Sequence, residues 1–403
     1  MSSTKPVVVY GASGYTGRLT CEYLREYNIP FIAAGRDANL VRQVMETKVP
    51  GIETADYEVR QVDNNVDALT DLFKGAKVVC NMVGPFMTYG PTCAEAALRA
   101  GCHYLDTTGE QDWCMLADEK FGERYAEKGL LISPSTAHQF STSDIAAHIA
   151  LETPGVDSLD IISIWGGMPT KASTATIFTI LMADHHYLEQ NQYVKYPPAA
   201  YFEVVLPGQH QTSLVMSNWS SPHPVWHKRN PRVANCKVLG GVFNRAVMEQ
   251  VVAMAKMVEE KIKPLDPDGQ RAALAEVAKG VQAGMPPREN QRVNRSLDSV
   301  YATGAHKSVS VVIRGANNYK QTGLYQAWSA HNLVIGRPRA VGFASVCQAF
   351  GHREALAAQQ YHGLLGEPVV GGDVAAVPAP APATTLGRLN GAGVAPGVLQ
   401  AVH

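Results

Sequence analysis

The chain has 403 residues, more than one hydrophobic core ordinarily holds, so about two domains are expected. Its 35 lysines and arginines nearly balance its 36 aspartates and glutamates. This balance leaves no basic excess for binding nucleic acid and no acidic excess typical of a solvating tail. It therefore favours a small molecule as the partner and argues against nucleic acid.

The composition also bears on location. No apolar run reaches the roughly 18 residues of a membrane span, and the N-terminus lacks a charged segment followed by an apolar one. The seven cysteines are scattered and form no Cys-x-x-Cys pair, as is typical of buried thiols in a reducing compartment. These features predict a cytoplasmic protein without an integral membrane segment.

Strand and helix patterns alternate through the first part of the chain, with short links between them. Strands are expected near residues 7–10, 31–34, 57–62, 77–81, 103–106 and 130–132, and helices near 16–27, 39–47, 66–73 and 91–100. This alternation is typical of an α/β fold with a doubly wound parallel sheet. We assign this domain to residues 1–150.

The pattern changes after about residue 157. Strands are expected at 159–165, 202–206 and 213–218, helices at 174–188, 246–261 and 269–283, and a hairpin of strands 308–313 and 324–330. These elements predict a second, α+β domain with an antiparallel sheet at residues 151–338. Residues 339–365 are expected to form a helix that returns to the first domain. Residues 366–403 are rich in Ala, Pro and Gly, which predicts a mobile tail.

The strongest local motif is Gly11-Ala12-Ser13-Gly14-Tyr15-Thr16-Gly17, which lies between an apolar strand and a helix. Gly11 permits a tight turn, Gly14 lets the backbone approach a phosphate, and Gly17 lets the helix pack on the strand. The start of the helix supplies N–H donors and the positive end of its dipole. The motif predicts a Rossmann-type site in which Gly11, Ser13, Gly14, Tyr15, Thr16 and Gly17 hold a dinucleotide pyrophosphate.

The end of the second expected strand indicates which dinucleotide binds. An NAD-binding protein places an acidic residue about 20 positions after the glycines to bind the ribose 2′-hydroxyl. This chain has Arg36 there, and a guanidinium can form paired hydrogen bonds with a 2′-phosphate. The next residue, Asp37, is expected to cap the following helix. The sequence thus favours NADP(H) over NAD, with a surface role for Arg36 as the alternative.

Two common classes of nicotinamide enzyme fit poorly. Short-chain dehydrogenases with a catalytic tyrosine need Tyr-x-x-x-Lys, which occurs at none of the sixteen tyrosines. Semialdehyde dehydrogenases need a nucleophilic cysteine in mid-chain, and neither Cys114 nor Cys236 has a convincing setting for that role. A third class remains.

Four ordered segments resemble the saccharopine dehydrogenase-like oxidoreductases, including the trans-acting enoyl reductase type. They are the glycine motif Gly11–Arg18, then Ala34-Gly35-Arg36, then Val78-Val79-Cys80-Asn81-Met82-Val83-Gly84-Pro85-Phe86, and the run from Ala100 to Glu110 that contains His103-Tyr104-Leu105-Asp106 and Gly109-Glu110. The resemblance covers about the first 150 residues. It implies hydride transfer in a cleft that an α+β domain completes.

The resemblance implies a reductase acting on a C=C or C=O bond of a small, lipophilic substrate such as an enoyl, polyketide or steroid-like compound. In parallel sheets ligands lie beyond the carboxyl ends of the strands, so Asn81, Gly84 and Pro85 are expected near the nicotinamide ribose. Two alternatives stay open: a dehydrogenase of an amino or hydroxy acid, and a non-catalytic NADP-binding sensor or scaffold. A homodimer through the sheet of the second domain is expected by analogy.

Hydride transfer leaves an anion that needs a proton donor. Tyr89 and His138 are the candidates, since each follows an expected strand of the first domain. Ser141 or Ser143 is expected to cap a helix, with Asp144 in its first turn, and Glu110 is expected to be a structural carboxylate.

No metal site is expected. His223 and His227 have metal-ligand spacing, but Pro224 argues against a helix there and the local sequence offers no third ligand. Aromatic and methionine residues of the second domain are expected to form its core, with a lipophilic pocket as the alternative. They are Trp165, Met168, Phe178, Met182, Trp219 and Trp226.

Overall fold

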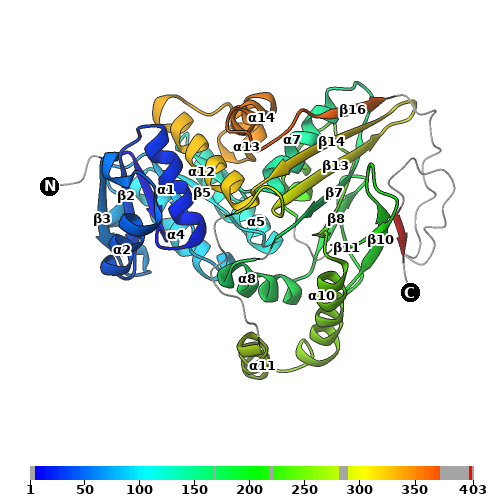
Figure 1. Cartoon of the computed structure of the whole chain (residues 1–403), viewed down its shortest axis with the longest axis horizontal. Coiled ribbons are helices and arrows are strands. Elements are labelled where there is room, and N and C mark those ends of the chain that lie inside the picture. The colour runs from blue at the N-terminus through cyan, green and yellow to red at the C-terminus, as the bar shows by residue number, and fades with distance from the viewer. Residues whose placement is uncertain (1–4, 168, 218–220, 281–288, 373–398, 402–403) are drawn as a thin grey trace. The chain divides into compact units, whose positions relative to one another are not determined.

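A computed structural model describes residues 5–167, 169–217, 221–280, 289–372 and 399–401 (Figure 1). The chain forms two compact units. Unit 1 contains Met1–Ser141, Pro287–Glu289 and Asn317–Leu365, and unit 2 contains Thr142–Pro286, Asn290–Ala316 and Gly366–His403. Met168 and Trp219, which were considered for the second core, lie outside the described residues.

Unit 1 is built on a parallel sheet with the strand order β15-β6-β5-β4-β1-β2-β3. Its strands are β1 (Val7–Tyr10), β2 (Phe31–Gly35), β3 (Tyr57–Gln61), β4 (Val78–Asn81), β5 (His103–Asp106), β6 (Leu131–Ser133) and β15 (Gly342–Phe343). The central strands β1, β2 and β4 are buried throughout, as expected of apolar strands covered on both faces. The predicted doubly wound α/β fold is confirmed.

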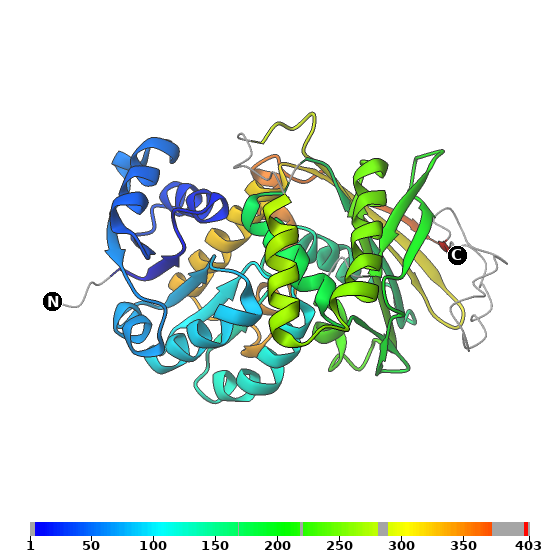
Figure 2. The same ribbon diagram turned by 90° about the horizontal axis from the view of Figure 1, so that it is seen from below.

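Helices cover both faces of this sheet (Figure 2). They are α1 (Tyr15–Glu26), α2 (Ala38–Lys48), α3 (Val66–Phe73), α4 (Phe86–Ala100), α5 (Gln111–Ala117), α6 (Glu123–Glu127), α12 (Asn318–Ile335), α13 (Val346–Phe350) and α14 (His352–Tyr361). On one face, side chains of α3 and α4 form a core with alternate strand residues such as Val8, Val79 and Tyr104. Against α1 packs α12, whose Gly323 is so close to Leu19 that an added Cβ would lie 2.8 Å from the Leu19 Cβ.

The predicted strand at residues 324–330 is wrong, because these residues belong to α12. Residues 321–327 of this helix are all buried, so its buried positions do not show a helical repeat. The structure also places α12 in unit 1, whereas residues up to 338 had been assigned to the second domain. The expected single helix at 339–365 is instead β15 followed by α13 and α14, all in unit 1.

Unit 2 contains a ten-stranded sheet whose main path is β16-β14-β13-β7-β12-β11-β10-β17, with β8 paired to β12 and β9. The strands are β7 (Ser158–Trp165), β8 (His186–Glu189), β9 (Gln192–Lys195), β10 (Tyr201–Val205), β11 (Thr212–Met216), β12 (Asn235–Val242), β13 (Arg295–Thr303), β14 (Ser308–Ala316), β16 (Val369–Gly372) and β17 (Leu399–Ala401). The pair β7–β12 is parallel, so the sheet is mixed and not purely antiparallel as predicted.

The helices of unit 2 are α7 (Phe140–Leu151), which begins at the end of unit 1, α8 (Lys171–Met182), α9 (His223–His227), α10 (Arg245–Met257), the following π-helix η4 (Val258–Ile262) and α11 (Pro267–Gly280). Trp165 and Met182 pack against a buried cluster that includes Met248 of α10. This finding supports the core role expected for these two residues. None of the helices in the described ranges is both long and apolar enough to cross a membrane.

Three further predictions for unit 2 are wrong. The helix expected at 174–188 ends at Met182, and the chain then turns back through Gln190 and Asn191, whose positive φ angles of 48° and 56° suit a tight hairpin. Residues 223–227 are helical, because a proline is tolerated in the first turn of a helix. The C-terminal segment is not entirely a mobile tail, since β16 pairs with β14 and β17 pairs with β10.

Candidate dinucleotide site and its surroundings

The glycine turn joins β1 to α1 and has the geometry that its sequence predicts. Gly11 has a φ of +90°, which favours glycine, and its N–H donates to the Ala34 carbonyl. A Cβ on Gly17 would lie 2.3 Å from the Gly11 carbonyl oxygen, so only glycine lets α1 start this close to the turn. The predicted roles of Gly11 and Gly17 in the turn are confirmed.

The start of α1 presents backbone donors to one side of the sheet. Its N-cap is Gly14, and no side chain caps the first turn, whose N–H groups have no intrahelical acceptor. A Cβ on Gly14 would meet only the Gly11 carbonyl oxygen, at 3.3 Å. The predicted ligand-binding residues Ser13 and Thr16 lie half-buried beside it. This arrangement suits an anion such as a pyrophosphate.

Tyr15 contributes to this turn differently from its neighbours. Its ring is 4% exposed and packs edge-on against Tyr319 of α12, with the two ring centroids 5.1 Å apart. The Arg18 guanidinium lies over the same ring, 4.4 Å from its centroid. The side chain of Tyr15 thus packs α1 against α12, and the Tyr15 backbone is the part that is available to a cofactor.

Arg36 follows β2 at the same edge of the sheet. It is exposed, it has no ion-pair partner among the described residues, and its charge acts on the phenol of Tyr10 at the end of β1. Burial raises the pKa of Tyr10 to about 12, and its hydroxyl donates to Asn64 Oδ1 at 3.3 Å. Asp37 accepts hydrogen bonds from the N–H groups of Asn39 and Leu40, so its predicted capping role is confirmed.

The segment after β4 is held by side chains of the sheet. Asn81 is fully buried: its Nδ2 donates to the Tyr104 hydroxyl at 3.0 Å, and its Oδ1 accepts from the Val83 N–H at 3.0 Å. The Gly84–Pro85 peptide bond is cis, and Pro85 is the N-cap of α4. The Asn81 side chain therefore shapes the turn, while Gly84 and Pro85 lie half-buried at the carboxyl edge of the sheet.

Glu110 caps the start of α4 from another part of the chain. Its two carboxylate oxygens accept hydrogen bonds from the Phe86 and Met87 N–H groups at 2.7 and 2.8 Å. Glu110 is 1% exposed, and burial raises its pKa to about 7. Its predicted structural role is confirmed.

Asp106, at the end of β5, is a connecting residue that the sequence analysis missed. One of its oxygens accepts from the Thr108 and Ser135 N–H groups, and the other accepts from the Tyr104 hydroxyl and the Trp113 Nε1 at 2.8 and 2.7 Å. Burial raises its pKa, and these four hydrogen bonds oppose the shift. Its place in the Ala100–Glu110 run was the available signal.

The network around Asp106 also reaches α12. The Gln326 Nε2 donates to the backbone oxygens of Asp106 and Thr136 at 2.8 and 2.7 Å. These two bonds fix the carboxyl ends of β5 and β6 relative to each other. The amino ends of the same strands are joined by His103, whose Nδ1 accepts from the Leu131 N–H at 2.8 Å.

The two proposed proton donors lie in different surroundings. Tyr89 is half-buried in the first turn of α4 and interacts electrostatically with Tyr10. The charge of Arg36 also acts on Tyr10. His138 follows β6, is 6% exposed, and its N–H donates to the Thr322 hydroxyl at 3.0 Å. Burial lowers the pKa of His138 to about 3, so its imidazole is neutral at physiological pH.

The segment around His138 has an unusual backbone. Ser135 and Gln139 both have a φ of 61°, a conformation that non-glycine residues adopt at some energetic cost. The helix α7 begins at Phe140, so Ser141 and Ser143 lie inside it and Asp144 lies in its second turn. The expectation that one of these serines is the N-cap and that Asp144 lies in the first turn is wrong.

The cysteines are free and buried at all seven positions. Burial raises the pKa of the Cys114 and Cys236 thiols well above the usual value, which keeps both from forming the thiolate that a nucleophile needs. A semialdehyde dehydrogenase mechanism therefore has no support in either residue.

Two families match this chain. Residues 7–131 match the one described as "Saccharopine dehydrogenase NADP binding domain". Residues 141–373 match the one described as "Family of unknown function (DUF5938)". The first match covers the glycine turn, Arg36 and Asp106.

Three relatives illustrate the similarity. A "Saccharopine dehydrogenase-like oxidoreductase" of Mus musculus is 32% identical over 152 residues, which are 34% of this chain and 35% of the relative. A "Trans-acting enoyl reductase" of Mycobacterium ulcerans (strain Agy99) is 30% identical over 145 residues, 35% of this chain and 34% of the relative. A "Lipid droplet localized protein" of Caenorhabditis elegans is 32% identical over 133 residues, 31% of each chain. The chain thus spans about a third of the length of each of these relatives.

Proposed function

Because the chain belongs to the DUF5938 family and carries a saccharopine dehydrogenase NADP binding domain, we propose that it is an NADP(H)-dependent reductase. One observation carries this proposal: the start of α1, which no side chain caps, lies at the same edge of one parallel sheet as the Arg36 guanidinium, which has no ion-pair partner in the described ranges. They supply donors for a pyrophosphate and for a 2′-phosphate, the two features that define this dinucleotide.

The residues of unit 1 have distinct parts in this proposal. NADPH supplies a hydride when it is bound. Ser13, Gly14 and Thr16 hold the pyrophosphate through the turn, and Arg36 binds the adenosine 2′-phosphate. Asn81, Gly84 and Pro85 shape the backbone beside the nicotinamide ribose, and their position depends on the hydrogen bonds of Tyr104 and Glu110.

In this proposal Tyr89 or His138 assists protonation of the anion that hydride transfer leaves. His138 is favoured by its place after β6, where two residues of the segment have a strained backbone. Because its imidazole is neutral, His138 would stabilise the developing anion by donating a hydrogen bond, and water would supply the proton. Tyr89 is less favoured, since it interacts electrostatically with Tyr10, which in turn interacts with Arg36, the residue assigned to the 2′-phosphate.

The proposed substrate is small and lipophilic, with a C=C or C=O bond that accepts hydride. The names of two relatives support this class, since one is an enoyl reductase and another is located on lipid droplets. The proposal includes a homodimer and a cytoplasmic location, and no nucleic-acid partner.

The central test is turnover. Purified full-length protein is incubated with NADPH and with enoyl thioesters, enones, steroids or quinones, and oxidation of NADPH is followed by absorbance. We expect substrate-dependent oxidation that His138→Asn reduces more than Tyr89→Phe. Tight NADPH binding without turnover of any substrate would contradict the enzyme assignment and favour a sensor. Turnover only with NADP+ and an amino or hydroxy acid would reverse the proposed direction.

The cofactor preference has its own test in Arg36→Ala. A charge-assisted hydrogen bond contributes about 1.5–3 kcal/mol, so we expect NADPH affinity to fall by about 10–100-fold while NADH affinity changes little. Fluorescence titration of both cofactors measures this. Arg99→Ala is the matched control, because Arg99 is an exposed arginine of the same unit near the other end of α4, paired with Glu95. Unchanged NADPH affinity in Arg36→Ala would remove Arg36 from the site.

A further inference from the structure

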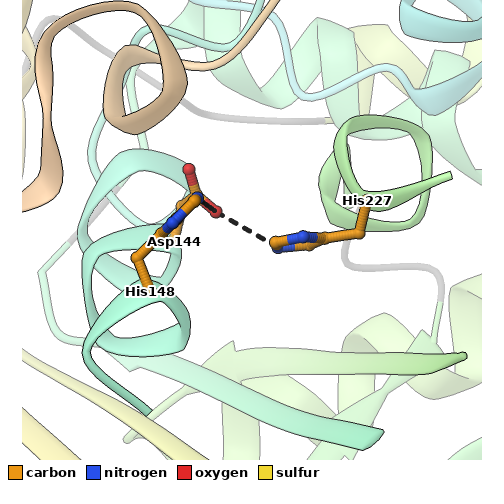
Figure 3. Close-up of side chains that lie close together, drawn as sticks. All are labelled: Asp144, His148 and His227. Carbon is orange, nitrogen blue, oxygen red and sulfur yellow. Dashed lines mark ion pairs between the residues drawn. The ribbon is translucent and has the colours of Figure 1, made fainter. Parts of the chain in front are cut away.

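Unit 2 contains a cluster of three potential metal ligands that no part of the proposed reductase uses. Asp144 and His148 lie one turn apart on α7, and His227 is the last residue of α9 (Figure 3). Their candidate ligand atoms all lie within 4.8 Å of one another. The sequence offered no third ligand beside the histidines of α9, and the fold supplies two from a helix about 80 positions earlier.

The spacing of the ligand atoms suits a small metal ion. Asp144 Oδ1 lies 3.6 Å from His148 Nε2 and 3.4 Å from His227 Nε2. Two ligand atoms that each bind a tetrahedral zinc ion at about 2.0–2.1 Å lie roughly 3.3 Å apart. Both measured distances are within a few tenths of an ångström of this value. Figure 3 shows the two imidazoles approaching the same carboxylate from different helices.

The hydrogen bonding of the cluster also indicates a cation site. His227 is fully buried, and neither of its ring nitrogens makes a hydrogen bond of normal geometry to a described residue. Buried polar nitrogens are rarely left in this state. The Asp144 side chain is 1% exposed and lies between the imidazoles of His148 and His227. A buried carboxylate between two imidazoles is a donor set typical of divalent transition metals.

A neighbouring histidine, His223, differs from His227 in that its ring nitrogens have hydrogen-bond partners. His223, at the start of α9, has both ring nitrogens near serine hydroxyls: Nε2 lies 3.0 Å from Ser143 Oγ, and Nδ1 lies 3.1 Å from Ser221 Oγ. These hydrogen bonds engage the ring fully, so His223 is not available as a ligand. They also hold α9 against α7, which keeps His227 facing Asp144.

We propose that Asp144, His148 and His227 bind a divalent transition-metal ion, with Zn²⁺ as the best fit and water as the fourth ligand. The ion would fasten the short helix α9 to α7 inside unit 2. Its binding free energy would add to the stability of this unit, as structural zinc sites do. None of these three residues is among those assigned to NADPH.

Zinc binding to the full-length protein tests this proposal. Protein treated with a chelator is titrated with Zn²⁺ in competition with a chromophoric chelator, and thermal unfolding is followed with and without the ion. We expect one tightly bound Zn²⁺ per chain and a higher Tm with zinc. His227→Gln should weaken binding by more than the roughly 10–100-fold that loss of an outer partner causes. Asp144→Asn should do the same.

His185→Gln is the matched control, because His185 is another buried histidine of unit 2, with its Nε2 2.9 Å from the Ile180 carbonyl oxygen. It should bind zinc as the wild type does. Titration with Co²⁺ provides a readout in the unaltered protein, since a tetrahedral site gives intense visible absorption. Absence of this absorption in the wild type, or equal zinc affinity in the wild type and His227→Gln, would overturn the proposal.

Discussion

Glu110 links the segment that resembles other oxidoreductases to the start of α4. Its carboxylate is 1% exposed and satisfies two backbone N–H groups that belong to a helix beginning 24 residues earlier in the chain. His103, Tyr104 and Asp106 from the same segment likewise bond to backbone or side-chain groups inside unit 1. The shared motif is thus mainly a set of structural hydrogen bonds that position the loops at the carboxyl edge of the sheet.

Removing this cap should destabilise unit 1. Glu110→Ala leaves the buried Phe86 N–H and the part-buried Met87 N–H without acceptors, and a lost acceptor costs about 1–3 kcal/mol when the group is buried. We expect the free energy of unfolding to fall by about 2–5 kcal/mol in urea denaturation, with weaker NADPH binding as a result. Glu110→Gln keeps one acceptor oxygen and should lose less. Glu95→Ala, at an exposed ion pair on α4, should change stability by less than about 1 kcal/mol; an equal loss would contradict the role of Glu110.

Local signals explain which residues the sequence predicts correctly. Gly11 and Asp37 act on backbone groups within a few positions or in the neighbouring strand, so the motif itself contains the information. The Asp106–Gln326 contact joins residues 220 positions apart, and His227 meets Asp144 from another helix. Neither contact has a local signature, so the Asp106 network and the metal cluster appear only once the chain is folded.

At the scale of elements, the β1–α1 turn needs one glycine for close packing of the helix and another for the approach of a phosphate, and two variants separate these needs. Gly17→Ala brings a Cβ to 2.3 Å from a backbone oxygen, so the helix must shift. We expect a loss of about 1–3 kcal/mol of stability, together with weaker NADPH binding. Differential scanning calorimetry and cofactor titration measure the two effects.

Gly14→Ala is the comparison for that variant. Gly14 has a φ of −71° and a ψ of 165°, which alanine adopts readily, and its Cβ would meet only one atom, at 3.3 Å. We expect nearly normal stability but weaker NADPH binding, because the methyl group would occupy the approach to the pyrophosphate. If Gly14→Ala binds NADPH like the wild type, the phosphate does not lie against this turn.

Elements with one clear periodicity are predicted well, and α12 shows where periodicity no longer indicates the element. The helix α3 has the predicted bounds, because its apolar positions repeat at helical spacing between the cap Asn65 and Gly75. In α12, buried residues occur on almost every side, including Gln321, Gln326 and Ser329. A helix buried on most of its surface loses its amphipathic pattern, and a short apolar stretch of it then resembles a strand.

For the whole molecule, buried titratable groups predict how stability changes with pH. Burial raises the pKa of Glu110 to about 7 and that of Asp298, on β13, to about 8. Burial also lowers the pKa of three histidines: His103 and His185 to about 4, and His138 to about 3. The carboxyl groups and the histidines therefore affect the stability of the folded state over different pH ranges.

The raised carboxyl pKa values mean that the folded state keeps protons that the unfolded state has released above about pH 4.5. Stability from these groups is therefore highest at low pH and is lost as the pH rises through 7 to 8. The histidines act in the opposite sense: they remain neutral in the folded state, so their contribution is lost as the pH falls below about 6.5. Between about pH 4.5 and 6.5 the two effects oppose each other.

We therefore expect the free energy of unfolding to fall by about 2–3 kcal/mol between pH 6.5 and 8, measured by urea denaturation. The largest single share of this decrease comes from Asp298, which is fully buried and accepts a hydrogen bond from the Ser163 hydroxyl at 2.6 Å. Asp298→Asn cannot ionise and should flatten the decrease. A decrease of the same size in the variant would show that the carboxyl has an ordinary pKa.

Unit 1 is assembled from segments that are far apart in the chain, with Asn317–Leu365 added to the first 141 residues. This arrangement has a consequence for synthesis on the ribosome. The face of α1 around Tyr15 and Leu19 is translated before α12, which covers it, and the whole of β7 to β14 is made in between. At roughly 5–20 residues per second, the nascent domain waits about 10–35 seconds for its missing helix. During that time an apolar surface is exposed, so newly made chains need chaperones more than an uninterrupted domain would.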